Sequence, residues 1–339
     1  MQTRLRVRRA DPDSGIAPHY DEYAAEVPEW STVLDALIQV REEQDGTLAL
    51  RCSCRSAICG SCAMRVNGEA GLACKTKLAE VASDGEAVTV EPMGNMPVVR
   101  DLVVDMQPFW DKVRAVHPFL QPDGPPPSGR EYIAPDETMQ HLTGVMNCIM
   151  CGACVSDCTV LEVDDKFLGP AALAKAYRFA ADPRDDQTEE RLTALFNLDG
   201  GMWDCTHCLA CVQVCPKDVA PMDRILKLRE MAMDAGLEDH NGVRHSDSFA
   251  HSVEHAGRLD ENRLAAESFG LTNLRAQLEN IPVALRMLLS GKLPNPIHRP
   301  IPKADEVKRL FHEAAARKGQ PEAAPAVQTS ATTTGEADT

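Results

Sequence analysis

The spacing of the cysteines constrains this chain more than any other feature of its sequence. All but one of the 13 cysteines fall into three groups with regular internal spacing. The Arg-rich N-terminus is followed by polar residues rather than by an apolar run, so we expect no signal peptide. Because the cysteines of a non-secreted chain are kept reduced, the pattern predicts metal ligation rather than a disulfide framework.

The first group has the spacing C-x4-C-x2-C, followed by a fourth cysteine beyond a predicted hairpin. This plant-type arrangement binds a [2Fe–2S] cluster, and Gly60 permits the sharp turn that such a loop requires. A zinc site is the alternative, although zinc loops usually pair one C-x2-C with a second such pair. Cys52 lies outside the pattern and is expected to be a small buried thiol. The predicted [2Fe–2S] ligands are Cys54, Cys59, Cys62 and Cys74.

The other two groups each have the spacing C-x2-C-x2-C-x3-C, and the last ends in Cys215-Pro216. This is the signature of two-cluster ferredoxins, in which the final cysteine of each run binds the other cluster. A pair of zinc knuckles is the alternative, but we interpret His207 as a spacer because each run already supplies four cysteines. Cys208 is left open. The crossed pattern predicts a [4Fe–4S] cluster on Cys148, Cys151, Cys154 and Cys215, and a third cluster on Cys158, Cys205 and Cys211.

Periodicity predicts strands in roughly the first hundred residues and helices after them. Leu5 and Val7 alternate with arginines as in a strand, and residues 87–91 form a second β-prone run. The Asn67-Gly68 pair suits a type I′ hairpin. Ser31 or Thr32 can cap a helix over residues 33–38. Further helical patterns cover residues 97–120, 171–181 and 247–291.

Segments rich in proline, glycine or small polar residues separate these patterns. Residues 121–129 are expected to be a linker, and residues 292–302 are interrupted by prolines. The segment 318–339 lacks apolar periodicity and is expected to be disordered.

Composition excludes some classes of partner. A net charge of -16 argues against nucleic acid, which requires a basic face, and disfavours anionic membrane surfaces for the same reason. The sequence has no run of about 18 apolar residues, so we expect no transmembrane segment.

The chain resembles the iron–sulfur subunits of succinate dehydrogenase and fumarate reductase. In addition to the cysteine runs, residues 97–105 and 166–173 are similar to the segments between clusters in that family. The resemblance implies an α+β chain that begins with a plant-type ferredoxin β-grasp domain. The implied parts are this domain at 1–107, an α-helical two-cluster ferredoxin-like domain at 108–235, a helical C-terminal extension at 236–317 and a tail at 318–339.

The resemblance also implies a linear relay. An FAD-containing flavoprotein subunit would oxidise succinate, and this chain would carry the electrons through three clusters to quinone at membrane anchor subunits. Succinate chemistry then belongs to the partner, and we expect no catalytic residue here. The chain would lie at the cytoplasmic side of the membrane, held there by its partners. A fumarate reductase, including one linked to thiol or heterodisulfide chemistry, is the alternative within the family. A soluble ferredoxin-like carrier and a zinc-stabilised scaffold are rivals outside it.

The sequence departs from the family pattern at three places. Familiar members bind a [3Fe–4S] third cluster and have no cysteine at the position of Cys208, whose spacing here favours a second [4Fe–4S] cluster. A Trp after Cys158 and a His after Cys205, both near quinone in mitochondrial-like members, are replaced by residues 160–163 and Thr206. Quinone is then held by other residues and by membrane subunits, or the acceptor is another protein. The extension beyond about residue 233 is interpreted as a helical brace that docks on a partner, rather than as a link to thiol chemistry.

Overall fold

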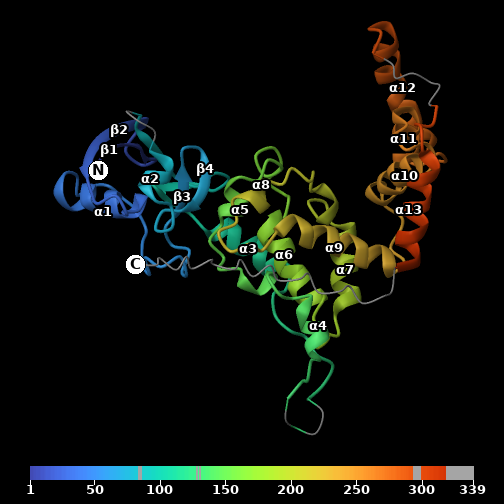
Figure 1. Cartoon of the computed structure of the whole chain (residues 1–339), viewed down its shortest axis with the longest axis horizontal. Helices are drawn as coiled ribbons and strands as arrows, with labels where there is room; N and C mark the ends of the chain where they lie inside the picture. The colour runs from blue at the N-terminus through green and yellow to red at the C-terminus, as the bar shows by residue number, and fades with distance from the viewer. Residues whose placement is uncertain (83–85, 127–128, 130, 293–298, 318–339) are drawn as a thin grey trace, which may run out of the picture. The chain divides into compact units, whose positions relative to one another are not determined.

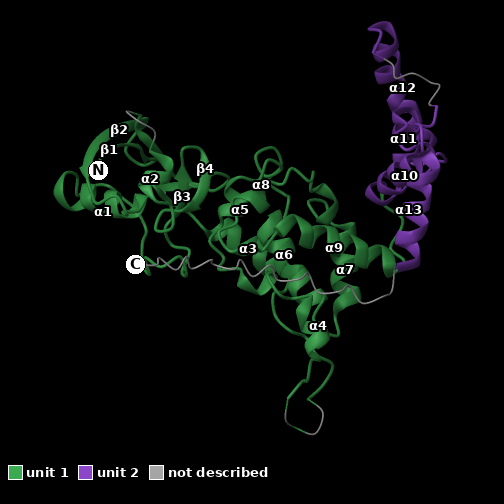
Figure 2. Cartoon of the chain, in the orientation of Figure 1, with its two compact units in different colours: residues 1–240 green, residues 241–339 purple. Residues whose placement is uncertain are grey.

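The computed structural model describes residues 1–82, 86–126, 129, 131–292 and 299–317 of the 339-residue chain. The chain divides into two compact units, unit 1 at residues 1–240 and unit 2 at residues 241–339 (Figure 2). Unit 1 holds every cysteine. None of the helices in the described ranges is long and apolar enough to cross a membrane.

Unit 1 begins with a five-stranded sheet of order β2-β1-β5-β3-β4 (Figure 1). β1 pairs in parallel with β5, whereas β1–β2, β3–β4 and β3–β5 are antiparallel. Leu5 and Val7 are fully buried, which confirms the alternating strand pattern. Asn67 and Gly68 have φ values of 50° and 88°, as the predicted type I′ hairpin requires. The strands are β1 (Gln2–Asp11), β2 (Ile16–Glu26), β3 (Ala63–Val66), β4 (Glu69–Leu72) and β5 (Val88–Glu91).

Helix α1 (Val33–Glu43) follows β2 and supplies a large part of the core of this region. The Thr32 side chain accepts a hydrogen bond from the Asp35 amide, and the Asp35 carboxylate accepts one from the Thr32 amide. This capping box confirms the predicted helix start and selects Thr32 over Ser31 as its cap. Leu34 and Leu37 of α1 are buried. A short helix, α2 (Leu78–Val81), comes after the cysteine loop.

The helix predicted over residues 97–120 is wrong for its first half. The chain there forms a small hairpin, β6 (Val98–Arg100) and β7 (Val103–Val104), before α3 (Gln107–Ala115) begins. Asp101 makes the turn with a φ of 47°, and its carboxylate accepts hydrogen bonds from Arg9 Nε and from the amide of Ala49. These long-range contacts outweigh the helical spacing of the valines, whose β-branched side chains also suit strands.

The rest of unit 1 is helical. Helix α6 is mostly buried and packs against α3, α7 and α9, so it forms the centre of this region. It confirms the helix predicted over residues 171–181, and Pro170 lies in its first turn, where proline is favoured. The helices are α4 (Asp136–Gln140), α5 (Ala153–Ser156), α6 (Gly169–Ala180), α7 (Thr188–Asn197), α8 (Ala210–Gln213) and α9 (Pro221–Asp234), with 3-10 turns η2 (Val145–Asn147) and η3 (Met202–Asp204).

Arg191 fixes the irregular chain that precedes these helices. It is 7% exposed, pairs with Asp185 at 3.0 Å and donates hydrogen bonds to the carbonyls of Val116, His117 and Phe119. One buried guanidinium therefore donates hydrogen bonds to three carbonyls that accept none within a helix or a strand.

Unit 2 consists of helices, as the extension was expected to. The predicted helical run 247–291 is divided into three helices, and a fourth follows. Helix α10 packs against α11 and α13, whereas α12 buries none of its residues. The predictions for residues 293–298 and for the tail at 318–339 lie outside the described residues. The helices are α10 (Asn241–Ala256), α11 (Glu261–Ser268), α12 (Leu274–Leu289) and α13 (Ala304–Arg317).

Candidate iron–sulfur sites

The first cysteine loop turns its backbone amides toward its own sulfurs. Cys54 Sγ accepts hydrogen bonds from the amides of Ile58 (3.4 Å) and Cys59 (3.3 Å), and Cys74 Sγ accepts one from the amide of Ala57 (3.3 Å). N–H groups directed at sulfur stabilise negative charge on a thiolate or on a cluster. The loop is therefore shaped for a charged sulfur centre and fits the predicted [2Fe–2S] group.

This loop has unusual backbone angles. Gly60 has a φ of 74°, as expected, but Arg55 and Ala57 each have a φ of 54° although they carry side chains. Such left-handed residues cost free energy and concentrate at functional sites. Sequence reasoning identified Gly60 and missed the other two, because Arg and Ala carry no signal for this conformation.

The thiols of this loop differ in how easily they ionise. Hydrogen bonds from Ser61 and from the amide of Cys54 lower the pKa of the Cys59 thiol to about 6. Burial raises the pKa of Cys62 to about 12. The positive charge of bound iron would offset this burial cost, because thiolate is the form that binds metal.

The first cysteine run of the helical region lies beside Cys215. Cys148, Cys151, Cys154 and Cys215 line one hollow, whose wall includes Ala171 and Ala174 of α6. Burial, together with neighbouring thiols, raises the pKa of Cys151 and of Cys154. Buried thiols this close to one another would remain protonated unless a positive centre lay between them. The four cysteines therefore fit a [4Fe–4S] cluster.

The remaining cysteines of the two runs form a third group. Burial and the charges of Cys208 and Cys205 raise the pKa of Cys158, while burial and three neighbouring cysteines raise that of Cys211 to about 12. The predicted ligands Cys158, Cys205 and Cys211 are therefore within electrostatic range of one another and of Cys208, which the sequence left open. Burial would raise the pKa of Cys208, but hydrogen bonds from Thr159 outweigh it and lower that pKa.

The loops around Cys151 and Cys208 have the same backbone pattern. Met150 and Gly152 flank Cys151 with φ values of 56° and 85°, and His207 and Leu209 flank Cys208 with 59° and 68°. A short helix follows each loop, α5 after Gly152 and α8 after Leu209. A leucine in this conformation is unusual, so the second loop keeps the shape of the first despite its cost.

Arg229 of α9 lies beside the third group and was not identified from the sequence. It is 7% exposed, and its Nη2 donates hydrogen bonds to the carbonyls of Cys205 (2.9 Å) and Met202 (2.7 Å). Its guanidinium also contacts His207 Nε2 and lies 4.8 Å from the centre of the Trp203 ring. Burial lowers the pKa of Arg229, with Cys205 acting in the opposite direction, but arginine stays protonated in proteins. A fixed positive charge therefore adjoins the predicted ligand Cys205.

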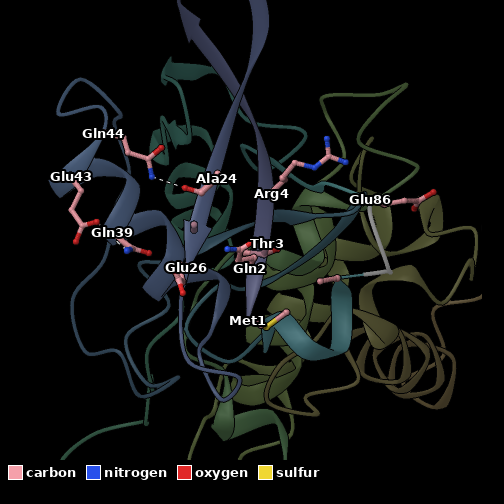
Figure 3. A pocket seen from close by; sticks show the side chains of 12 residues that line it. Met1, Gln2, Thr3, Arg4, Ala24, Glu26, Gln39, Glu43, Gln44 and Glu86 are labelled. Carbon is pink, nitrogen blue, oxygen red and sulfur yellow. Dashed lines mark hydrogen bonds between the residues drawn. The ribbon is translucent and has the colours of Figure 1, made fainter.

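Other features of unit 1 stand apart from these groups. Cys52 is half-buried rather than buried. A hollow of about 780 Å³ lies beside the ends of β1, β2 and α1, where Gln44 Nε2 donates to the carbonyl of Ala24 at 2.7 Å (Figure 3). Its lining includes no cysteine. In the described part of the chain, no three His, Cys, Asp or Glu side chains are arranged for a single metal ion.

Comparisons with known proteins agree with this geometry. Residues 4–111 match the model of the 2Fe-2S iron-sulfur cluster binding domain, and residues 144–219 match that of the 4Fe-4S dicluster domain. The chain is 37% identical over 233 residues (68% of this chain, 82% of the relative) to succinate dehydrogenase [ubiquinone] iron-sulfur subunit 1, mitochondrial, from Oryza sativa subsp. japonica. It is 35% identical over 280 residues (81% of this chain, 85% of the relative) to the 8-methylmenaquinol:fumarate reductase iron-sulfur subunit of Wolinella succinogenes.

A solved structure is similar as well. A chain of the Mycobacterium smegmatis Sdh1 complex in the apo form superposes with a TM-score of 0.63 and 26% identity, covering 70% of this chain and 98% of that one. Fold, cysteine grouping and relatives agree that the chain carries [2Fe–2S] and [4Fe–4S] domains that transfer electrons. The chain belongs to the family of iron–sulfur subunits of succinate dehydrogenase and fumarate reductase.

Proposed function

We propose that this chain relays electrons between the FAD of a flavoprotein subunit and quinone, in a succinate:quinone oxidoreductase whose membrane subunits anchor it at the cytoplasmic side. The clusters supply one-electron redox chemistry, and the chain supplies their ligands, order and surroundings. The [2Fe–2S] ligands are Cys54, Cys59, Cys62 and Cys74. Those of the [4Fe–4S] cluster are Cys148, Cys151, Cys154 and Cys215.

The contact between Gly60 and Cys151 is the observation that carries this proposal. A Cβ added to Gly60 would lie 2.9 Å from the Cβ of Cys151, so the first two cysteine loops touch. Lys75, next to Cys74, donates from Nζ to the carbonyl of Pro216, next to Cys215, at 3.2 Å. Electron transfer slows steeply with distance, and these contacts support direct transfer between the first and second clusters.

The proposal includes the fold of the N-terminal sheet. Its mixed five-stranded order, with α1 between β2 and β3 in the chain, supports the β-grasp fold of plant-type ferredoxins. Asp157 of the helical region accepts a hydrogen bond from the amide of Ala70 at 2.8 Å, and Asn95 donates to the carbonyl of Cys158 at 2.9 Å. The sheet and the cluster-binding helices are thus held together by direct hydrogen bonds.

We assign the third cluster as a second [4Fe–4S] cluster bound by Cys158, Cys205, Cys208 and Cys211. The shared backbone pattern of the Cys151 and Cys208 loops supports this assignment, because it presents Cys208 as the counterpart of a predicted [4Fe–4S] ligand. A [3Fe–4S] cluster on three cysteines is the competing assignment.

A fumarate reductase is the second candidate, and one observation favours it. Unit 1 makes up 240 of the 339 residues, so the alignment with the Wolinella subunit, over 81% of the chain, extends into unit 2. The Oryza alignment covers 68%. The relative that shares more of the extension is thus named a menaquinol:fumarate reductase subunit.

Redox assays of the purified complex separate the two candidates. Succinate oxidation by a ubiquinone analogue that outpaces fumarate reduction by a reduced menaquinone analogue supports the first. The reverse ratio, in the same preparation, replaces it with the second.

A further inference from the structure

Helix α12 carries a large apolar face that none of the described residues of unit 2 covers. Its big aliphatic side chains recur at intervals of four and three residues, which places them on one side of a helix. All of them are more than half exposed. This leucine face consists of Leu274 (74% exposed), Leu278 (65%), Ile281 (55%), Leu285 (52%) and Leu288 (59%).

The packing of α12 turns this face outward. Gln277 Nε2 donates hydrogen bonds to the carbonyls of Ala266 (2.8 Å) and Gly270 (3.1 Å), at the end of α11. Asn280 and Met287, on the same side as Gln277, are half-buried. The polar and mixed side of α12 thus contacts its own unit, and the leucine face is left to solvent.

The charge of this segment is opposite to that of the chain. Residues 283–302 contain Arg286, Lys292 and Arg299 and no acidic residue, whereas the chain has a net charge of -16. Within α12 the acidic residue Glu279 is paired with Arg275 at 3.0 Å. The repulsion of anionic surfaces expected from the overall charge is therefore reversed at this segment.

We propose that α12 binds the surface of an anionic bilayer, lying in its plane with the leucine face in the interface. Leucines on one side and arginines beside them are the pattern of such helices, because acyl chains cover the apolar face while lipid phosphates attract the basic side chains. Arg286 flanks the leucine face, where its aliphatic stem can lie along it and its head reach the phosphates, whereas Arg275 is paired with Glu279. The basic residues favour lipid over a protein partner, because a lipid surface offers apolar contact and negative charge together.

Vesicle flotation of the anaerobically purified full chain tests this inference. The chain is expected to bind phosphatidylglycerol-containing vesicles at least about tenfold more tightly than pure phosphatidylcholine vesicles, and added salt should weaken the binding. Failure of the chain to bind anionic vesicles overturns the inference.

Two substitutions on opposite sides of α12 test which side of the helix binds the vesicles. Leu285→Glu is expected to reduce the vesicle-bound fraction about tenfold. Val283→Glu places the same charge two residues away on the opposite side, where Val283 is 47% exposed, and should weaken binding far less. Equal effects of the two substitutions contradict the inference, and Arg286→Glu should remove the preference for anionic lipid.

An unchanged helix content by far-ultraviolet circular dichroism in these variants excludes loss of the unit 2 helices as the cause, and unchanged cluster absorbance excludes misfolding of unit 1. If Leu285→Glu instead releases a membrane subunit from the detergent-solubilised complex and leaves vesicle binding intact, the leucine face is a protein-docking surface and the membrane inference fails.

Discussion

Gly60 lies directly against Cys151, so the loop that holds the first cluster touches the loop that holds the second. A Cβ at Gly60 would stand 2.9 Å from the Cβ of Cys151 and 3.0 Å from its Cα, closer than such atoms approach one another. The backbone of Gly60 also has a φ of 74°, which favours glycine. Glycine is thus required at position 60 for two separate reasons: the positive φ of its backbone and the close approach of Cys151.

Gly60→Ala should therefore slow electron transfer between the [2Fe–2S] and [4Fe–4S] clusters and destabilise the chain by about 1–3 kcal/mol. Freeze-quench EPR and thermal unfolding measure the two effects. Gly68→Ala is the matched control, because Gly68 has a φ of 88° but nothing within 4 Å of an added Cβ. It should lower stability by about 1–2 kcal/mol and leave electron transfer unchanged. Equal electron-transfer rates in the two variants would show that the loop contact is not needed for the relay.

Cys208→Ser should convert the third cluster from [4Fe–4S] to [3Fe–4S]. The alcohol is a much poorer iron ligand than the thiolate, and three cysteines remain to hold the smaller cluster. EPR of the air-oxidised complex checks this, since a [3Fe–4S] signal should be present in the variant and absent from the unmodified protein. The same [3Fe–4S] signal in the unmodified protein contradicts the assignment of Cys208 as a ligand.

Arg229→Gln should lower the reduction potential of the third cluster. The guanidinium is buried and donates to the carbonyl of Cys205, so it stabilises the extra negative charge of the reduced state. Arg229→Lys keeps the charge but loses the planar fork, and should retain most of the potential. Potentiometric EPR titration measures the reduction potential of both variants. An unchanged potential in Arg229→Gln would contradict the proposed effect of Arg229 on the third cluster.

Asp182→Asn should destabilise the chain by about 3 kcal/mol at neutral pH, because it leaves two arginines without their buried partner. Burial would raise the pKa of Asp182, but hydrogen bonds from Arg184 and Arg178 outweigh this and lower it to about 2. A lowered pKa stabilises the folded state above the unfolded value near 4, and that stabilisation is lost as the pH falls toward 2.

Thermal unfolding of the Asp182 variant and the unmodified chain should accordingly differ most at neutral pH and converge below about pH 4. Asp199→Asn is the control, because the Lys166–Asp199 pair is exposed and should contribute less than about 1 kcal/mol. If the difference in thermal stability between Asp182→Asn and the unmodified chain did not change with pH, the two arginines would not be the cause of the lowered pKa of Asp182.

The cysteine pattern predicted much of this site because ligand spacing is a local property. Gly60 and the Asn67-Gly68 turn were predictable for the same reason, since each reports a backbone angle that few other residues tolerate. The hairpin at 98–104 was not, because Asp101 is held in its turn by Arg9 and Ala49, both distant in sequence. Arg229 was missed for a related reason: its partners Met202 and Cys205 come from another element, and nothing in the helical pattern of α9 marks it.

EPR of the intact complex reduced by succinate tests the relay most directly. Succinate should reduce clusters of this chain only while the flavoprotein subunit is bound, and Gly60→Ala should slow reduction of the clusters beyond the first. Reduction of the isolated chain by succinate, or no cluster reduction in the intact complex, would show that the chain does not relay electrons from the flavoprotein subunit.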